Sequence, residues 1–158
     1  MRTTTVDRMT ATAATSRPAL RALLLGGVPP RASGARRAAY TLGLLFGAAM
    51  VVASAAIHLH LWAIGYRNIH LIGPSFLFQA VSGFVLGPVL AAYRRLVVVA
   101  AAALFLAGSV VALLLSATVG FLGLHDDLSV PWAGWSLATE LAGFVVLLAC
   151  GGLALRRR

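Results

Sequence analysis

The feature that most constrains this chain is a set of four long apolar stretches that contain no Arg or Lys. A hydrocarbon core about 30 Å thick is crossed by about 20 apolar residues in an α-helix. The stretches are long enough, and they lack the alternation of apolar and polar residues that a barrel strand needs. They cover about residues 40–63, 73–93, 96–124 and 133–155. The sequence therefore predicts an all-α integral membrane protein, folded as an antiparallel four-helix bundle.

Composition excludes the main soluble alternatives. Of the 158 residues, 60% are hydrophobic and 11% are charged, whereas about a quarter of a soluble domain is charged. This excludes a soluble enzyme and a free nucleic-acid-binding domain, so we expect a lipid bilayer, and not nucleic acid, as the partner. The single cysteine, Cys150, offers neither an internal disulfide nor a metal-binding spacing. Walker, HExxH and CxxC motifs are absent from the sequence, which leans away from an enzyme.

The arginines predict how the spans are oriented. The net charge is +9, and all thirteen basic residues are arginines, a usage typical of high-GC bacteria. With four spans, twelve arginines fall on one side of the membrane and only Arg67 falls on the other. Basic residues are enriched on the cytoplasmic side. We therefore expect a multi-pass protein of a bacterial plasma membrane, with both termini cytoplasmic and the loops 64–72 and 125–132 outside.

Residues 1–37 differ from the rest of the chain. Their first part is rich in Thr and Ala and lacks apolar periodicity. The apolar run ALRALLLGGV is short, is interrupted by Arg21 and is followed by no clean cleavage site, which argues against a signal peptide. We expect a disordered cytoplasmic leader over residues 1–37, whose arginines contact anionic headgroups. The four-helix domain then covers residues 38–158.

Small residues at helical spacing indicate how the spans pack. Gly43 and Gly47 form a GxxxG pair in the first span, and Gly83 and Gly87 form another in the second. The third span carries a stripe of small residues four apart: Gly108, Ala112, Ser116 and Gly120. Because lipid gives no hydrophobic drive for helix association, close packing of small residues must supply it. The sequence does not separate packing inside one bundle from packing in a homodimer.

Polar residues from all four spans fall at a similar depth. This predicted polar layer consists of His58, Gln79, Ser116, Thr118 and Glu140. At 1.5 Å per residue, Glu140 lies about 10 Å inside the fourth span. An ionised and unpaired carboxylate in hydrocarbon costs about 2.5 kcal/mol or more. Glu140 must therefore be protonated or paired, with His58, Gln79 and Arg67 as candidate partners. It is either a proton or cation site or a structural clasp between helices.

Histidines and loop acids suggest a second site. The candidate metal ligands are His58, His60, His70, His125, Asp126 and Asp127. Nitrogen and oxygen ligands suit Zn or Cu, although this spacing matches no known ligand motif. On a regular helix His58 and His60 point about 200° apart, so a shared ion requires a frayed or extended segment. Haem is less favoured, because it needs two facing axial histidines and His58 alone lies well inside a span. The alternative is that His58 forms hydrogen bonds inside the bundle, whereas His60, His70 and His125 are interfacial polar residues.

The stretch HLHLWAIGYRNIHLIGPSFLFQAVSG, within about residues 56–90, resembles uncharacterised small four-helix membrane proteins of high-GC bacteria. The resemblance implies a similar topology and assigns no catalytic residue. Small size and short loops favour an accessory or structural subunit, within a homo-oligomer or a larger membrane complex. The alternatives are a metal- or redox-linked protein that uses the outer His/Asp cluster, and a proton-coupled carrier that uses Glu140.

Overall fold

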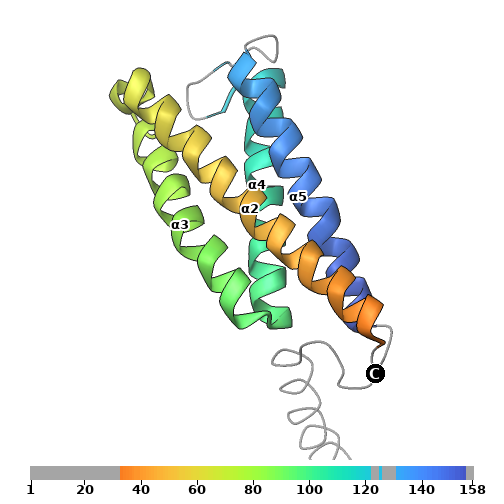
Figure 1. Cartoon of the computed structure of the whole chain (residues 1–158). Coiled ribbons are helices and arrows are strands. Elements are labelled where there is room, and N and C mark those ends of the chain that lie inside the picture. Colours follow the sequence, from red (N-terminus) through yellow and green to blue (C-terminus); the bar gives the residue numbers. More distant parts are fainter. Residues whose placement is uncertain (1–32, 122–124, 126–130, 156–158) are drawn as a thin grey trace, which may run out of the picture.

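The fold is a bundle of long α-helices. The computed structural model describes residues 33–121, 125 and 131–155. Each of the four helices in this part of the chain is long and apolar enough to cross a membrane. They are α2 (Gly34–Ile64), α3 (Ile72–Tyr93), α4 (Leu96–Thr118) and α5 (Pro131–Leu155), and a short 3-10 helix, η1 (Tyr66–Asn68), lies between α2 and α3 (Figure 1). The predicted all-α antiparallel four-helix bundle is confirmed.

Two helix ends differ from their predicted positions. Helix α2 begins at Gly34, so residues 34–37 are helical and do not belong to a disordered leader; residues 1–32 lie outside the described residues. Helix α4 ends at Thr118 and not at residue 124. There the Thr118 hydroxyl donates to the Leu114 carbonyl (2.7 Å), and Gly120 adopts a φ of 81°, which glycine tolerates without steric cost. The chain therefore leaves the helix earlier than its apolar composition indicates.

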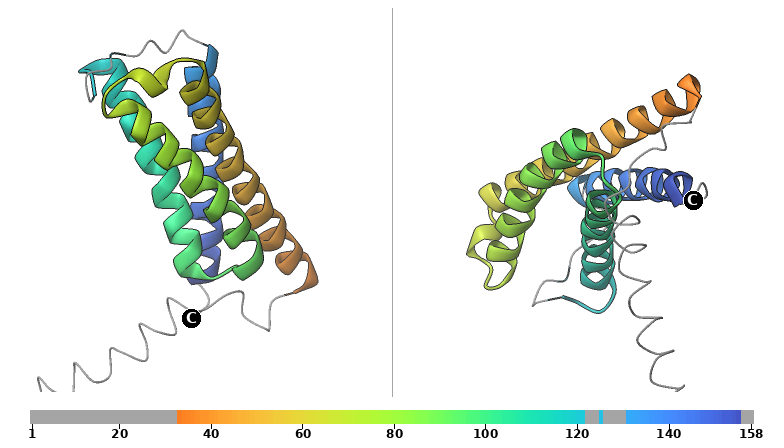
Figure 2. Two further views of the ribbon diagram at one scale, coloured as in Figure 1. Left: turned by 90° about the vertical axis from the view of Figure 1, so that its left-hand side faces the viewer. Right: turned by 90° about the horizontal axis from the view of Figure 1, so that it is seen from below.

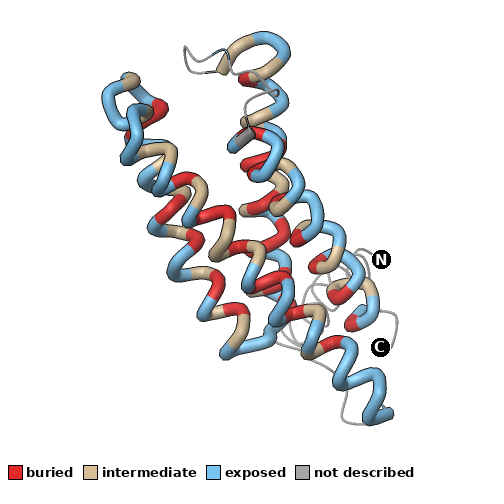
Figure 3. Tube along the Cα trace, turned by 45° about the horizontal axis from the view of Figure 1, so that its top comes forward, coloured by how far each residue is buried: buried red, intermediate tan, exposed pale blue. Residues whose placement is uncertain are grey.

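The helices pack as two pairs that spread at one end. The start of α2 and the end of α5 lie at the same end of the bundle, and η1 lies at the other, which we call the η1 end (Figures 1 and 2). Helix α2 packs closely on α3 and α5, and α4 packs closely on α5, whereas α3 and α4 touch much less. Figure 3 shows α2 and α3 diverging from α4 and α5 toward the η1 end. This divergence positions the site described below.

Buried apolar side chains occupy the part of the bundle away from the η1 end. The cluster includes Leu44, Val51, Leu90, Val99, Leu106 and Leu147, which are 0–2% exposed. Large apolar side chains also cover the outer surface, where Phe78 is 72% exposed and Leu104 is 73% exposed. Such a surface suits lipid, because lipid tails are as apolar as these side chains.

Glycines allow close helix contacts within the single chain. A Cβ placed on Gly87 of α3 would lie 2.5 Å from Val52 Cγ2 of α2. A Cβ on Gly47 of α2 would lie equally close, 2.5 Å, to Leu147 Cδ2 of α5. The GxxxG pairs therefore serve packing inside the bundle. Helix α4 differs, because a Cβ on Gly108 would meet no atom within 4 Å. The expectation that Gly108 packs against another helix of the same bundle is wrong.

Candidate functional site

Glu140 marks a buried polar cluster. Its side chain is 0% exposed. It lies nine residues from the η1 end of α5, and Ser54 and Ser109 lie ten and nine residues from the same end of α2 and α4. At 1.5 Å per residue all three are about 14 Å deep. For helices that cross a hydrocarbon core about 30 Å thick, this depth is near the middle of the span.

Three hydroxyl groups converge on one oxygen of Glu140. Ser109 Oγ donates to Oε1 at 2.6 Å, Ser54 Oγ at 2.8 Å and Ser136 Oγ at 3.0 Å. These serines lie on α4, on α2 and one turn earlier on α5. The other oxygen, Oε2, is buried and has no hydrogen-bond partner within the described part of the chain. One carboxyl group therefore links three helices and keeps one oxygen unused.

His58 lies beside this carboxyl group and is bonded through both ring nitrogens. Its Nδ1 is 4.0 Å from Glu140 Oε1 and 2.9 Å from the backbone carbonyl oxygen of Ser54. A carbonyl oxygen only accepts hydrogen bonds, so Nδ1 carries a hydrogen. The other nitrogen, Nε2, is 3.4 Å from Ser109 Oγ. The Ser109 hydroxyl therefore contacts both His58 and Glu140.

These contacts fit two positions of one proton. When Ser109 donates to Glu140, its oxygen accepts from Nε2, so His58 is an imidazolium and Glu140 a carboxylate. When Ser109 donates to Nε2, its oxygen accepts a hydrogen from Glu140, and both groups are neutral. The states interconvert when the Glu140 proton moves to Ser109 and the Ser109 proton moves to Nε2. Ser109 thus lies where it can relay a proton, with no change in the net charge of the cluster.

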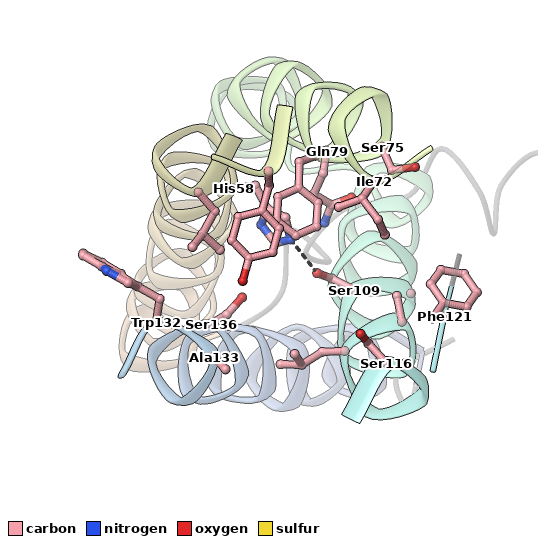
Figure 4. A pocket seen from close by; sticks show the side chains of 16 residues that line it. His58, Ile72, Ser75, Gln79, Ser109, Ser116, Phe121, Trp132, Ala133 and Ser136 are labelled. Carbon is pink, nitrogen blue, oxygen red and sulfur yellow. Dashed lines mark hydrogen bonds between the residues drawn. The ribbon is translucent and has the colours of Figure 1, made fainter. Parts of the chain in front are cut away.

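A cavity of about 150 Å³ adjoins the cluster on the side of the η1 end. All four long helices contribute to its walls, and Figure 4 shows Gln79, Ser109 and Ser136 around this space. Its polar lining consists of His58, Tyr66, Ser75, Gln79, Ser109, Ser116, Trp132 and Ser136, and the rest is apolar. Among the described residues that line it, none is Arg, Lys, Asp or Glu. The cavity is therefore a largely apolar space with a few hydrogen-bonding groups.

Gln79 gives this cavity an unused donor. Its Nε2 atom is buried and has no hydrogen-bond partner within the described residues. A buried donor left without an acceptor costs about 1–3 kcal/mol. Nε2 itself has almost no accessible surface, so an acceptor in the cavity would remove this cost once the Gln79 side chain turns its amide toward the cavity.

The structure separates the residues of the predicted polar layer. His58 and Glu140 lie together, whereas Gln79 and Ser116 line the neighbouring cavity. Thr118 does not join them, because it is exposed and bonds within its own helix. Arg67, another candidate partner of Glu140, is exposed in η1.

Sequence reasoning missed the three serines that bond Glu140. The available signal was spacing: Ser54 precedes His58 by four residues, and Ser136 precedes Glu140 by four. Residues four apart share a helix face, so each serine had to point the same way as a residue already singled out. Ser109 carries no comparable signal, because the apolar part of α4 holds no titratable residue.

The predicted metal ligands do not gather within the described part of the chain. No three His, Cys, Asp or Glu side chains there lie close enough to hold a metal ion. His58 is buried in the bundle, whereas His60 is exposed and its ring lies 4.5 Å from that of Trp132. Their opposite directions follow from a regular helix through residue 59. His70 and His125 are exposed, and Asp126 and Asp127 lie outside the described residues.

Comparison with protein families, with curated proteins and with solved structures found no match. The resemblance of residues 56–90 to small four-helix membrane proteins stays a prediction. Function is therefore inferred from the chemistry of Glu140, His58 and the cavity beside them.

Proposed function

We propose that the protein is a proton-coupled membrane carrier in which Glu140 takes up and releases the coupled proton. The observation that carries this proposal is the fully buried carboxyl group, bonded by three hydroxyls, with His58 Nδ1 4.0 Å away. A structural clasp needs only hydrogen bonds. Here a second titratable group is added, and Glu140 Oε2 is left to accept a proton.

The pairing with His58 reduces the energetic cost of burying the Glu140 carboxyl group in the bundle. An isolated charge near the middle of the bilayer is costly. With one proton shared through Ser109, the pair has no net charge in either arrangement. In one arrangement both groups are neutral, and in the other the imidazolium compensates the carboxylate. Entry or loss of a proton changes the net charge of the site by one unit. Binding or release of a substrate in the adjoining cavity is coupled to that change in net charge.

We also propose that the η1 end faces outward in a bacterial plasma membrane, with the start of α2 and the end of α5 cytoplasmic. The support is the placement of twelve of the thirteen arginines on one side. In this orientation the cavity lies between the outer face and Glu140, and it provides the route by which a proton or substrate arrives. The role of an accessory subunit in a larger membrane complex stays a prediction, which co-purification tests.

The test uses the fact that Glu140 is the only glutamate in the chain. Protein labelled with ¹³C at the glutamate carboxyl carbon gives one carboxylic signal, and its chemical shift reports protonation. We expect this signal to move reversibly when the pH of the sample is changed. We expect His58→Gln to alter that response. Glu140→Gln provides the control, because it removes the signal.

The opposite result is equally clear. If the carboxyl signal stays in one position as the pH is changed while the protein remains folded, Glu140 is a clasp and not a proton site. An unchanged response in His58→Gln would remove His58 from the mechanism. Circular dichroism recorded on the same samples shows whether each variant remains folded.

A further inference from the structure

We infer that the cavity binds a small, uncharged and largely apolar molecule, about the size of a substituted benzene ring, through one hydrogen-bond acceptor that bonds Gln79. The role of this molecule as the carried substrate rests on the proposed function. Its binding does not, because the cavity and Gln79 are independent of any proton movement.

The size and walls of the cavity favour a ring. An apolar cavity of about 150 Å³ holds benzene, and this one has about the same volume, 150 Å³. Phe76 lies edge-on to His58, with ring centroids 5.1 Å apart and planes at 74°. Tyr66 stacks on Phe76 at 5.1 Å and 15°. These three rings form a continuous aromatic wall, on which a flat ligand gains favourable edge or face contacts.

The lining favours a molecule without charge. The described lining residues include no Arg, Lys, Asp or Glu, and the ring nitrogens of His58, which does line the cavity, already contact Ser54 O and Ser109 Oγ. Near the middle of the bilayer an unpaired charge is costly. Glu140 does not line the cavity, and its Oε1 already accepts three hydroxyl donors. A neutral ligand therefore fits the site better than an ion does.

The hydrogen-bonding groups specify an acceptor on the ligand. The hydroxyls of Ser75, Ser109 and Ser136 already donate to Leu71 O or to Glu140. Gln79 Nε2 has no such acceptor within the described residues and is shielded from the surface. A ketone, ester or ether oxygen supplies the missing acceptor when the Gln79 side chain turns its amide toward the cavity, while the rest of the molecule stays apolar. This chemistry distinguishes the ligand from a plain hydrocarbon.

The experiment uses the fact that Gln79 is the only glutamine and Asn68 the only asparagine. Protein labelled with ¹⁵N in these side chains gives one amide pair for each residue. Acetophenone is titrated as the probe, and α-methylstyrene, in which a CH₂ group replaces the carbonyl oxygen, is the matched hydrocarbon. We expect acetophenone to shift the Gln79 pair saturably, to leave Asn68 unmoved and to bind about tenfold more tightly than α-methylstyrene.

Two neighbouring residues on α4 provide matched variants. Ala112 lines the cavity, so Ala112→Phe fills it and we expect loss of the shift. Val111 does not line the cavity and is 55% exposed toward the surroundings, so Val111→Phe should leave the shift unchanged. Gln79→Leu keeps the space and removes the donor. In saturation-transfer spectra of the ligands, this variant should bind both probes with similar affinity.

The inference is wrong if acetophenone leaves Gln79 unmoved, if Val111→Phe abolishes the shift as Ala112→Phe does, or if Gln79→Leu still prefers acetophenone. Proton coupling is tested separately in the same samples. If the probe binds but the Glu140 carboxyl signal changes neither with the probe nor with pH, the cavity assignment is kept and the proposed function is removed. If the Glu140 signal responds to pH but neither probe binds, the proposed function is kept and the cavity assignment is removed.

Discussion

The Ser109 hydroxyl lies 2.6 Å from Glu140 Oε1, closer than the hydroxyls of Ser54 and Ser136. Of these three hydroxyls, it is the one for which the structure also gives a contact with a ring nitrogen of His58, 3.4 Å away. All three serines stabilise the carboxyl group by a hydrogen bond. Ser109 alone among them connects the acid to the imidazole through its hydroxyl group, so removal of this hydroxyl has a consequence that removal of the other two lacks.

The first prediction compares Ser109→Ala with Ser136→Ala. Each variant loses one buried hydrogen bond to Glu140, and Ser109→Ala also loses the contact with His58 Nε2, so each should lower the free energy of unfolding in detergent by about 1–3 kcal/mol. Only Ser109→Ala should also shift the ring nitrogen signals of His58 in ¹⁵N-histidine spectra, with assignment by His58→Gln. Equal effects of both variants on these signals would show that Ser109 serves packing and not proton transfer.

The second prediction concerns the carboxyl group itself. Glu140→Gln keeps a carbonyl oxygen that the serine hydroxyls can bond, so the variant should fold with stability close to that of the parent chain. Glu140→Leu leaves three hydroxyls without this acceptor and should lose at least about 2 kcal/mol. Denaturation in detergent measures both. If Glu140→Gln loses as much as Glu140→Leu, the negative charge beside His58 holds the fold, and a freely shared proton is excluded.

The spans were predictable because length and apolar composition decide them, whereas the partners of Glu140 depend on how each helix is rotated. Serine is a weak signal, since in a helix it can bond its own backbone as readily as a neighbour. The small residues of α4 show the same limit. Gly108 and Ala112 line a cavity, and the larger Val99 and Leu106 fill the core. A small residue permits a close contact or leaves a space, and sequence does not distinguish the two.

The third prediction separates two glycines on that basis. A Cβ on Gly87 would lie 2.5 Å from Val52 Cγ2 and 3.1 Å from the Ala48 carbonyl oxygen. Gly87→Ala should therefore push α3 away from α2 and cost about 1–3 kcal/mol, as overpacking does. Gly108→Ala meets no atom within 4 Å and removes a residue that disfavours helix, so it should be neutral or stabilising by up to about 1 kcal/mol. Thermal unfolding in detergent tests the pair, and equal losses would contradict it.

The fourth prediction concerns the orientation of the bundle. Cys150 is the only cysteine and is 4% exposed, so Cys150→Ala gives a background for single cysteines. His125 and Arg95 are both exposed and lie in connections at opposite ends of the bundle. If basic residues hold the Arg94–Arg95 connection in the cytoplasm, His125→Cys should react with a membrane-impermeant maleimide on intact cells and Arg95→Cys should not.

Permeabilised cells provide the control for this labelling. There both cysteines should react, because both positions are exposed in the structure. This result would show that a cysteine that fails to react in intact cells is not simply buried. Reaction of Arg95→Cys alone in intact cells would invert the topology. Glu140 would then be reached through the cavity from the cytoplasm, because the cavity lies between the cluster and the η1 end. The hydrogen bonds of the cluster do not depend on orientation, so inversion would reverse the route of the proton and leave the Glu140–Ser109–His58 relay unchanged.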